Sequence, residues 1–470
     1  MMGESELHYK TIREVAELIE KKQISPVEVT TAVLSRIERL DGDLKSYATV
    51  MSEHAKRAAA KAEAEIIAGS YRGALHGVPV AVKDLCFTKG VRTMGGTKVY
   101  ADHIPKVDAT VVERLEAAGA VLLGKLNLTE GAMGGYNPEF QIPVNPWDPG
   151  RWSGASSSGS GVATAAGLCF GSLGSDTGGS IRYPSAACGT AGLKPTWGRV
   201  SRYGVLPLAD SLDHVGPMTR SSIDAAIMFQ VIAGADQKDP TSLPEPMPDM
   251  LQGIGQDISG VRIGFDEEFA SKDVDPELAA AIAEGVKTLE QLGAEIVEVK
   301  LPYLDEYVAG WVTLCSAEAV AAHRETYPSR GDEYGPYFRK WLEIGATVTG
   351  ADYALANNLR AACVGHLQNL FQRIDILACP AVLGPARKIT PEEGYGPPPP
   401  FGDEYHKGHR FTVPFDYNGA PTLTLPCGMN SEGVPLSIQL AGKHLDERLL
   451  CRVGAAYEKA TDWHTLHPLP

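Results

Sequence analysis

The sequence predicts an α/β fold in which one large mixed, mostly parallel central sheet is covered by helices on both faces. Short apolar runs alternate along the chain with segments whose apolar residues recur at helical spacing. The 470 residues, 44% of them hydrophobic, suffice for the large core that such a fold requires. By length alone the chain could form one large α/β domain or two to three smaller ones, and it contains no internal repeat.

Helices are expected to fill the N-terminal 70 residues. Two capping boxes, Thr11 with Glu14 and Ser25 with Glu28, each precede apolar residues at helical spacing. Pro26 suits the first turn of the second helix, where its missing N–H is not needed.

A buried strand is predicted over residues 77–82, because this segment is short, apolar and rich in valine. It places Lys83 at its end. The same reasoning predicts helices over 108–118 and 277–293 and strands over 120–123, 261–265, 295–299 and 375–380. The proline- and glycine-rich segment 390–402 is expected to be either an ordinary surface loop or a lid.

Composition excludes several classes of function. The formal charge of -15 argues against a surface for nucleic acid or anionic membranes. The sequence contains no run of 18 apolar residues, so no transmembrane helix is expected. The eight cysteines are scattered without a Cys-x-x-Cys pair, which favours a cytoplasmic protein with buried free thiols over a disulfide framework or a zinc site. Neither a metal nor a cofactor is expected.

The segment 150–199 carries the most chemistry. Its Ser/Gly-rich tract 153–161 is flanked by tryptophans and small apolar residues, which indicates a packed segment instead of a flexible linker. Further on, the glycines of the run 177–180 can turn backbone N–H groups inward, beside the hydroxyl of Ser180. Such a site suits acyl transfer, although Gly-x-Ser-x-Gly is absent and no histidine lies near in sequence.

With these motifs the chain resembles the amidase signature family, whose hydrolases use a Ser–cis-Ser–Lys triad. The resemblance covers most of the chain and rests on segments 77–84, 124–127, 154–159, 176–184, 192–196, 198–201 and 411–421. It implies the amidase signature fold as a single domain over residues 1–470. Within it the resemblance implies a 1–70 N-terminal helical segment, a 74–220 catalytic core, a 225–370 variable substrate-shaping region and a 371–470 C-terminal part that completes the core.

The resemblance also implies roles for single residues. Lys83 would be the general base, Ser156 the bridging serine and Ser180 the nucleophile, with a cis peptide bond between Ala155 and Ser156. Ser157 or Ser158 stays open as an alternative relay, because relatives often carry glycine at the last position of the serine triplet.

The remaining site residues follow from the same resemblance. Backbone N–H groups of Thr177, Gly178, Gly179 and Ser180 would form the oxyanion hole, and Asp176 and Arg182 would be buried scaffold charges. Met133, Tyr136 and Trp152 would line the acyl pocket, although ordinary core packing explains each of them equally well.

A lysine can act as base only when it is neutral, and its reference pKa of about 10.4 leaves it charged near pH 7. Burial penalises the ammonium form and lowers the pKa. Lys83 follows an apolar run, so we expect it to be buried.

The predicted function is hydrolysis of a small or aryl amide through a seryl acyl-enzyme, with carbamates, hydrazides and esters open as substrates of the same route. The expected partner is the small-molecule substrate, and a homodimer is open. Two alternatives are the A subunit of a tRNA-dependent amidotransferase and a non-catalytic ligand-binding relative. His409 and Arg410 precede Phe411 where such amidotransferase chains carry an aspartate, which argues against the former.

Overall fold

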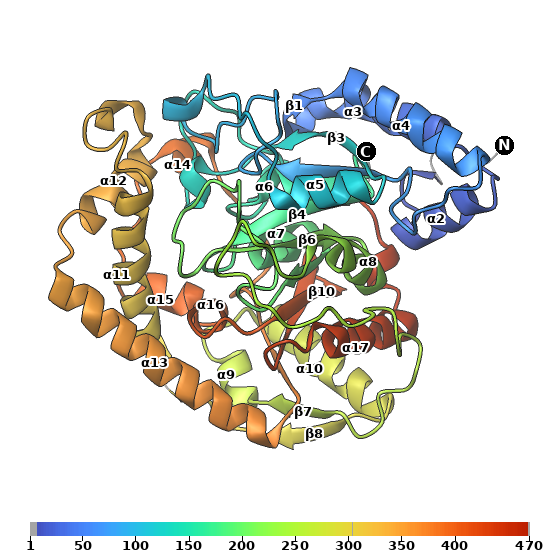
Figure 1. Ribbon diagram of the computed structural model, residues 1–470. Coiled ribbons are helices and arrows are strands. Elements are labelled where there is room, and N and C mark those ends of the chain that lie inside the picture. Colours follow the sequence, from blue (N-terminus) through green and yellow to red (C-terminus); the bar gives the residue numbers. More distant parts are fainter. Residues whose placement is uncertain (1–6, 303, 469–470) are drawn as a thin grey trace.

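The computed structural model, which describes residues 7–302 and 304–468, confirms the predicted α/β class (Figure 1). Its described residues form one eleven-stranded sheet in the order β1-β3-β2-β4-β6-β5-β10-β11-β9-β7-β8. The strands are β1 (Tyr47–Val50), β2 (Pro79–Lys83), β3 (Val121–Leu126), β4 (Gly171–Asp176), β5 (Ala191–Lys194), β6 (His214–Thr219), β7 (Arg262–Phe265), β8 (Glu295–Glu298), β9 (Ile376–Cys379), β10 (Thr422–Met429) and β11 (Pro435–Gly442).

Helices surround this sheet. In the first half of the chain they are α2 (Ile12–Glu20), α3 (Pro26–Leu44), α4 (Ser52–Ile67), α5 (Thr110–Ala117), α6 (Ser158–Ala165), α7 (Arg182–Cys188) and α8 (Ser222–Ile232). In the second half they are α9 (Glu267–Ser271), α10 (Pro276–Gln291), α11 (Asp305–Ala322), α12 (Pro336–Gly345), α13 (Gly350–Arg373), α14 (Pro391–Tyr395), α15 (Asp403–His409), α16 (Val413–Tyr417) and α17 (Glu447–Ala460).

The sheet is mixed, as predicted, but the prediction that it is mostly parallel is wrong. Only β2–β3, β2–β4, β7–β8 and β7–β9 pair in parallel, and the other six pairs in the described chain are antiparallel. For the pair β10–β11 the physical reason is connection length. Strands β10 and β11 are joined by a turn of five residues, whereas a parallel pair needs a crossover of a dozen or more.

Both predicted capping boxes are present at the starts of α2 and α3. The expectation of helices alone in the N-terminal segment is wrong at β1, which pairs antiparallel with β3 at the end of the sheet. This strand is only four residues long, and only Tyr47 in it is buried, so it leaves almost no hydrophobic pattern.

Two glycines of β4 show how the sheet is covered on its two faces. A Cβ atom at Gly171 would meet Met228 of α8, whereas one at Gly174 would meet Ser157 and Ile181, at the starts of α6 and α7. Because residues three apart on a strand face opposite sides, α8 covers one face of the sheet and α6 and α7 the other. Helices α6 and α7 are buried along their whole length.

Helices α11, α12 and α13 form an outer layer at one side of the molecule, on the left in Figure 1. The described ends of the chain lie together, since Tyr9 stacks on His467. All eight cysteines are buried free thiols, as predicted. In the described ranges, no helix has the length and apolar character needed to cross a bilayer.

Candidate active site

The side chain of Lys83 is at the centre of the site. It lies at the end of β2 with no exposed surface, and its Nζ is 2.6 Å from Ser156 Oγ, 2.9 Å from Ser157 Oγ and 2.8 Å from Ser175 Oγ. A Cβ at Gly174 would lie 3.0 Å from Ser157 Oγ, so glycine in β4 leaves room for this arrangement. The structure therefore joins the apolar strand of Lys83 to the serine-rich tract.

Burial lowers the pKa of Lys83 to about 7, and the carboxylates of Asp176 and Asp213 offset only part of that effect. Near neutral pH a large fraction of the amine is therefore unprotonated. In this form Nζ donates two hydrogen bonds and accepts one, which matches its three hydroxyl partners.

The geometry distinguishes the three consecutive serines. Ser157 Oγ donates to the carbonyl oxygen of Ser175 at 3.1 Å, so it meets Lys83 as an acceptor. Ser158 Oγ lies 2.9 Å from the hydroxyl of Tyr136 and makes no hydrogen bond to Lys83. Ser156 Oγ contacts Lys83 without a competing acceptor among the described residues, and the Ala155–Ser156 peptide bond is cis, as the family resemblance implies.

Ser180 lies on the loop between β4 and α7, beside the serine tract. The N–H of Ser157 donates to the carbonyl oxygen of Ser180 at 3.3 Å, and a Cβ at Gly154 would overlap the backbone of Pro184. The two segments are thus in direct backbone contact. Ser180 is half-buried and borders the aromatic-lined cavity described below.

The loop of Ser180 differs in one respect from the expected oxyanion hole. The N–H of Gly179 donates to Asp176 Oδ1 at 2.6 Å, so that group is already engaged and its predicted role is not supported. The N–H groups of Thr177, Gly178 and Ser180 have no acceptor within the described ranges, and all three residues border the cavity. They remain the donors available for an oxyanion.

The buried side chains of Asp176 and Arg182 stabilise this loop. Asp176 also accepts the N–H of Ile181, and its carboxylate pairs with the guanidinium of Arg182, with all of these side chains fully buried. Burial by itself would raise the pKa of Asp176, but Arg182 holds it well below its usual range. Arg182 also pairs with Asp416 and donates to the carbonyl oxygen of Thr412 at 2.8 Å.

Replacing Arg182 by methionine is expected to reduce the free energy of unfolding by about 3–5 kcal/mol, because two buried carboxylates lose their counterion. Urea denaturation measures this change. Arg324→Met is the control, since that side chain is 74% exposed, and it is expected to change stability by less than about 0.5 kcal/mol. Equal stability of the two variants would contradict a scaffold role for Arg182.

A cavity of about 410 Å³ opens above Ser180. Met133, Tyr136 and Trp152, the predicted substrate-binding residues, all lie in its wall. Further aromatic side chains come from segments far apart in the sequence: Tyr183, Trp311, Tyr337, Tyr405 and His409. No local pattern marked these, because the fold alone brings α7, α11, α12 and α15 together. The segment 390–402 contributes Glu393, Gly394, Pro397 and Pro399 to the wall.

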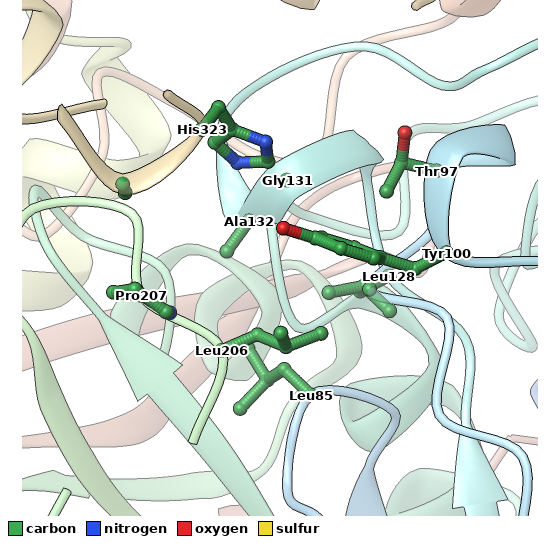
Figure 2. Close-up of a pocket in the computed structure, with 11 residues that line it drawn as sticks. Leu85, Thr97, Tyr100, Leu128, Gly131, Ala132, Leu206, Pro207 and His323 are labelled. Carbon is green, nitrogen blue, oxygen red and sulfur yellow. The ribbon is translucent and has the colours of Figure 1, made fainter. Parts of the chain in front are cut away.

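A second, much smaller cavity lies behind the turn of Gly131 and Ala132 (Figure 2). Tyr100 and His323 border it together with apolar side chains such as Leu85. Its volume of about 20 Å³ holds one water molecule at most, so it is too small for a substrate. Ala132 lies in the walls of both cavities.

The chain is similar to known proteins over nearly its whole length. The family model described as Amidase matches residues 28–451. "Putative amidase AmiD" of Mycobacterium tuberculosis is 45% identical over 458 residues, covering 97% of this chain and 95% of AmiD. The A subunit of the glutamyl-tRNA(Gln) amidotransferase of Thermosynechococcus vestitus is 38% identical, covering 97% of this chain and 99% of that subunit.

Among solved structures, a bacterial aryl acylamidase of the amidase signature enzymes superposes with a TM-score of 0.88 at 25% identity, covering 98% of each chain. The family match, the high identity over nearly the full length and the shared fold all agree. The chain belongs to the amidase signature family.

Proposed function

We propose that this protein hydrolyses the carbon–nitrogen bond of neutral aromatic or other apolar amides through a seryl acyl-enzyme. Ser180 is the nucleophile, Ser156 the proton relay and Lys83 the base. The observation that carries the proposal is the Lys83 amine, which is fully buried, has a pKa of about 7 and lies 2.6 Å from Ser156 Oγ.

In this mechanism neutral Lys83 takes the proton of Ser156 Oγ, which takes that of Ser180 Oγ. Ser180 Oγ bonds to the substrate carbonyl carbon, and the free N–H groups of Thr177, Gly178 and Ser180 stabilise the developing oxyanion. When the C–N bond breaks, the proton returns through Ser156 to the leaving nitrogen. Water then attacks the acyl-enzyme by the same proton path and releases the acid.

The preference for neutral, apolar substrates rests on the cavity wall. Its side chains are mostly aromatic or aliphatic, and the charged residues among them, Arg387 and Glu393, form an ion pair with each other at 3.6 Å. Both are more than half exposed. An aromatic amide can therefore bury its ring without leaving a charge unpaired.

Membership of an amidotransferase complex is the second candidate function, because relatives of that name are 38% identical over nearly the full length. The cavity argues against it. Residue 410 is an arginine whose guanidinium lies 3.8 Å from Asp273, and no unpaired carboxylate among the described residues lines the cavity to hold the α-amino group of glutamine.

The purified chain alone tests the proposal against both alternatives. We expect it to release amine or ammonia from neutral anilides and aryl amides, with far lower kcat/KM for glutamine. A panel that includes carbamates and esters defines the preferred bond. Turnover of glutamine alone, or only with added partner proteins, would support the amidotransferase instead, and no turnover of any member would support a non-catalytic relative.

The choice of Ser156 as relay predicts a difference between neighbouring serines. Ser156→Ala is expected to lower kcat by at least about 10³-fold, because Lys83 loses its path to the nucleophile. Ser158→Ala removes only a hydrogen bond to Tyr136 and is expected to lower kcat by less than about tenfold. Steady-state kinetics on one anilide measures both, and the reverse order would refute the assignment.

A further inference from the structure

His409 is the last residue of α15, and its half-buried ring forms part of the cavity wall. It stacks on Tyr405 with ring centroids 3.9 Å apart and meets the edge of Tyr183 at 5.7 Å. On a further side its ring lies 6.0 Å from that of Trp311. Tyr183 follows Ser180 by three residues, and both line the same cavity as this imidazole.

The hydrogen bond that His409 makes fixes its tautomer. Nδ1 lies 2.8 Å from the carbonyl oxygen of Tyr405, and because a carbonyl can only accept, Nδ1 must carry the proton. Burial lowers the pKa of His409 to about 4, so the ring is neutral at physiological pH. Nε2 is therefore an unprotonated acceptor, and it has no partner among the described residues.

We propose that His409 is a specificity-determining residue whose Nε2 accepts a hydrogen bond from an N–H or O–H group of a neutral aromatic amide. This inference rests on the proposed function, which it narrows to substrates that carry such a donor beside an aromatic or apolar group. A substrate with a carboxylate at this position is disfavoured, because the lone pair of His409 Nε2 would face the carboxylate oxygens with no proton between them.

Two matched pairs of probes test the proposal. 4-Hydroxyphenylacetamide and 4-methoxyphenylacetamide differ by a donor on the acyl part, whereas 4-hydroxyacetanilide and 4-methoxyacetanilide differ by a donor on the amine part. We expect the wild-type enzyme to prefer the hydroxylated member of at least one pair by about fivefold to tenfold in kcat/KM, the effect of one neutral hydrogen bond.

His409→Phe keeps an aromatic ring and removes the acceptor, so the preference is expected to fall to about twofold or less. His406→Phe is the matched control, since it lies on the same helix outside the cavity wall and should keep the wild-type preference. A preference that survives in His409→Phe, or the absence of any preference in an enzyme that hydrolyses both pairs, would overturn the proposal.

A second measurement separates this inference from the proposed hydrolysis. The Ser180→Ala protein binds the probes without turning them over, so ¹⁵N NMR of its histidine side chains reports the tautomer of His409 directly. The His409→Phe substitution identifies the His409 resonances. We expect a protonated Nδ1 and a bare Nε2 whose resonance shifts on addition of a hydroxylated probe and not its methoxy partner. A protonated Nε2, or a resonance that saturating probe leaves unmoved, would refute the role of His409 even if amides are hydrolysed.

Discussion

Replacing Ser180 by alanine is expected to lower kcat by about 10⁴- to 10⁶-fold, because it removes the hydroxyl that borders the cavity beside free backbone N–H donors. The neighbouring hydroxyl of Thr177 cannot substitute for it, since it donates to Asp213 Oδ1 at 2.6 Å. The fold should be unchanged, since the side chain of Ser180 is half-buried and its backbone makes the contacts to the serine tract. Steady-state kinetics on an anilide, with circular dichroism as a check on the fold, measures the effect.

Ser160→Ala is the matched control. Ser160 Oγ is buried and donates to the carbonyl oxygen of Leu173 at 2.9 Å, so its loss is expected to cost about 1 kcal/mol of stability and little activity. A serine-reactive fluorophosphonate should add once to the wild-type protein and, by peptide mapping, to Ser180. Near-normal turnover of Ser180→Ala, or labelling at a different serine, would contradict the nucleophile assignment.

Replacing Lys83 by methionine should cause the second large loss, by about 10³- to 10⁵-fold in kcat. Methionine occupies a similar volume but cannot accept the proton of Ser156. The loss should persist at alkaline pH, because the variant has no group at this position to deprotonate.

Lys125→Met separates catalysis from burial. Lys125 is equally buried on the neighbouring strand, but its Nζ donates to Thr93 and pairs with Asp84 at 3.3 Å. We expect this variant to unfold at lower denaturant concentration, because Asp84 is left unpaired, while the folded fraction keeps kcat within about tenfold of wild type. Similar kinetic losses in both variants would mean that Lys83 matters only for the fold.

Local sequence signals predicted part of this fold well. The valine-rich run before Lys83 is β2, and both capping boxes start the helices expected of them. Strand β4 gave no such signal, since its sequence GSLGSD contains one large apolar residue and is buried because tight packing favours glycine and serine there. The antiparallel centre of the sheet was missed because strand direction depends on how distant segments are connected.

The candidate site was also predicted only in part from the sequence. Motif resemblance located Lys83, Ser156 and Ser180, and the structure places them on adjoining segments. The engagement of the Gly179 N–H by Asp176 depends on the turn of the loop, which no residue type specifies. In the sequence, His409 stands out only as a departure from an expected aspartate. Its hydrogen bond to Tyr405 lies within α15, but its place beside Tyr183 and Trp311 depends on how the fold packs α15 against α7 and α11.

The dependence of kcat/KM on pH, from about pH 5 to about pH 10, tests the central claim most directly. For an anilide with rate-limiting acylation, kcat/KM should rise about tenfold per pH unit below about pH 7 and level off above about pH 8. The reason is that Lys83, with a pKa of about 7, is the base and acts only when it is unprotonated. A profile that is flat through this range, or whose rise is centred near the ordinary lysine pKa of about 10.4, would show that a buried neutral amine is not the base.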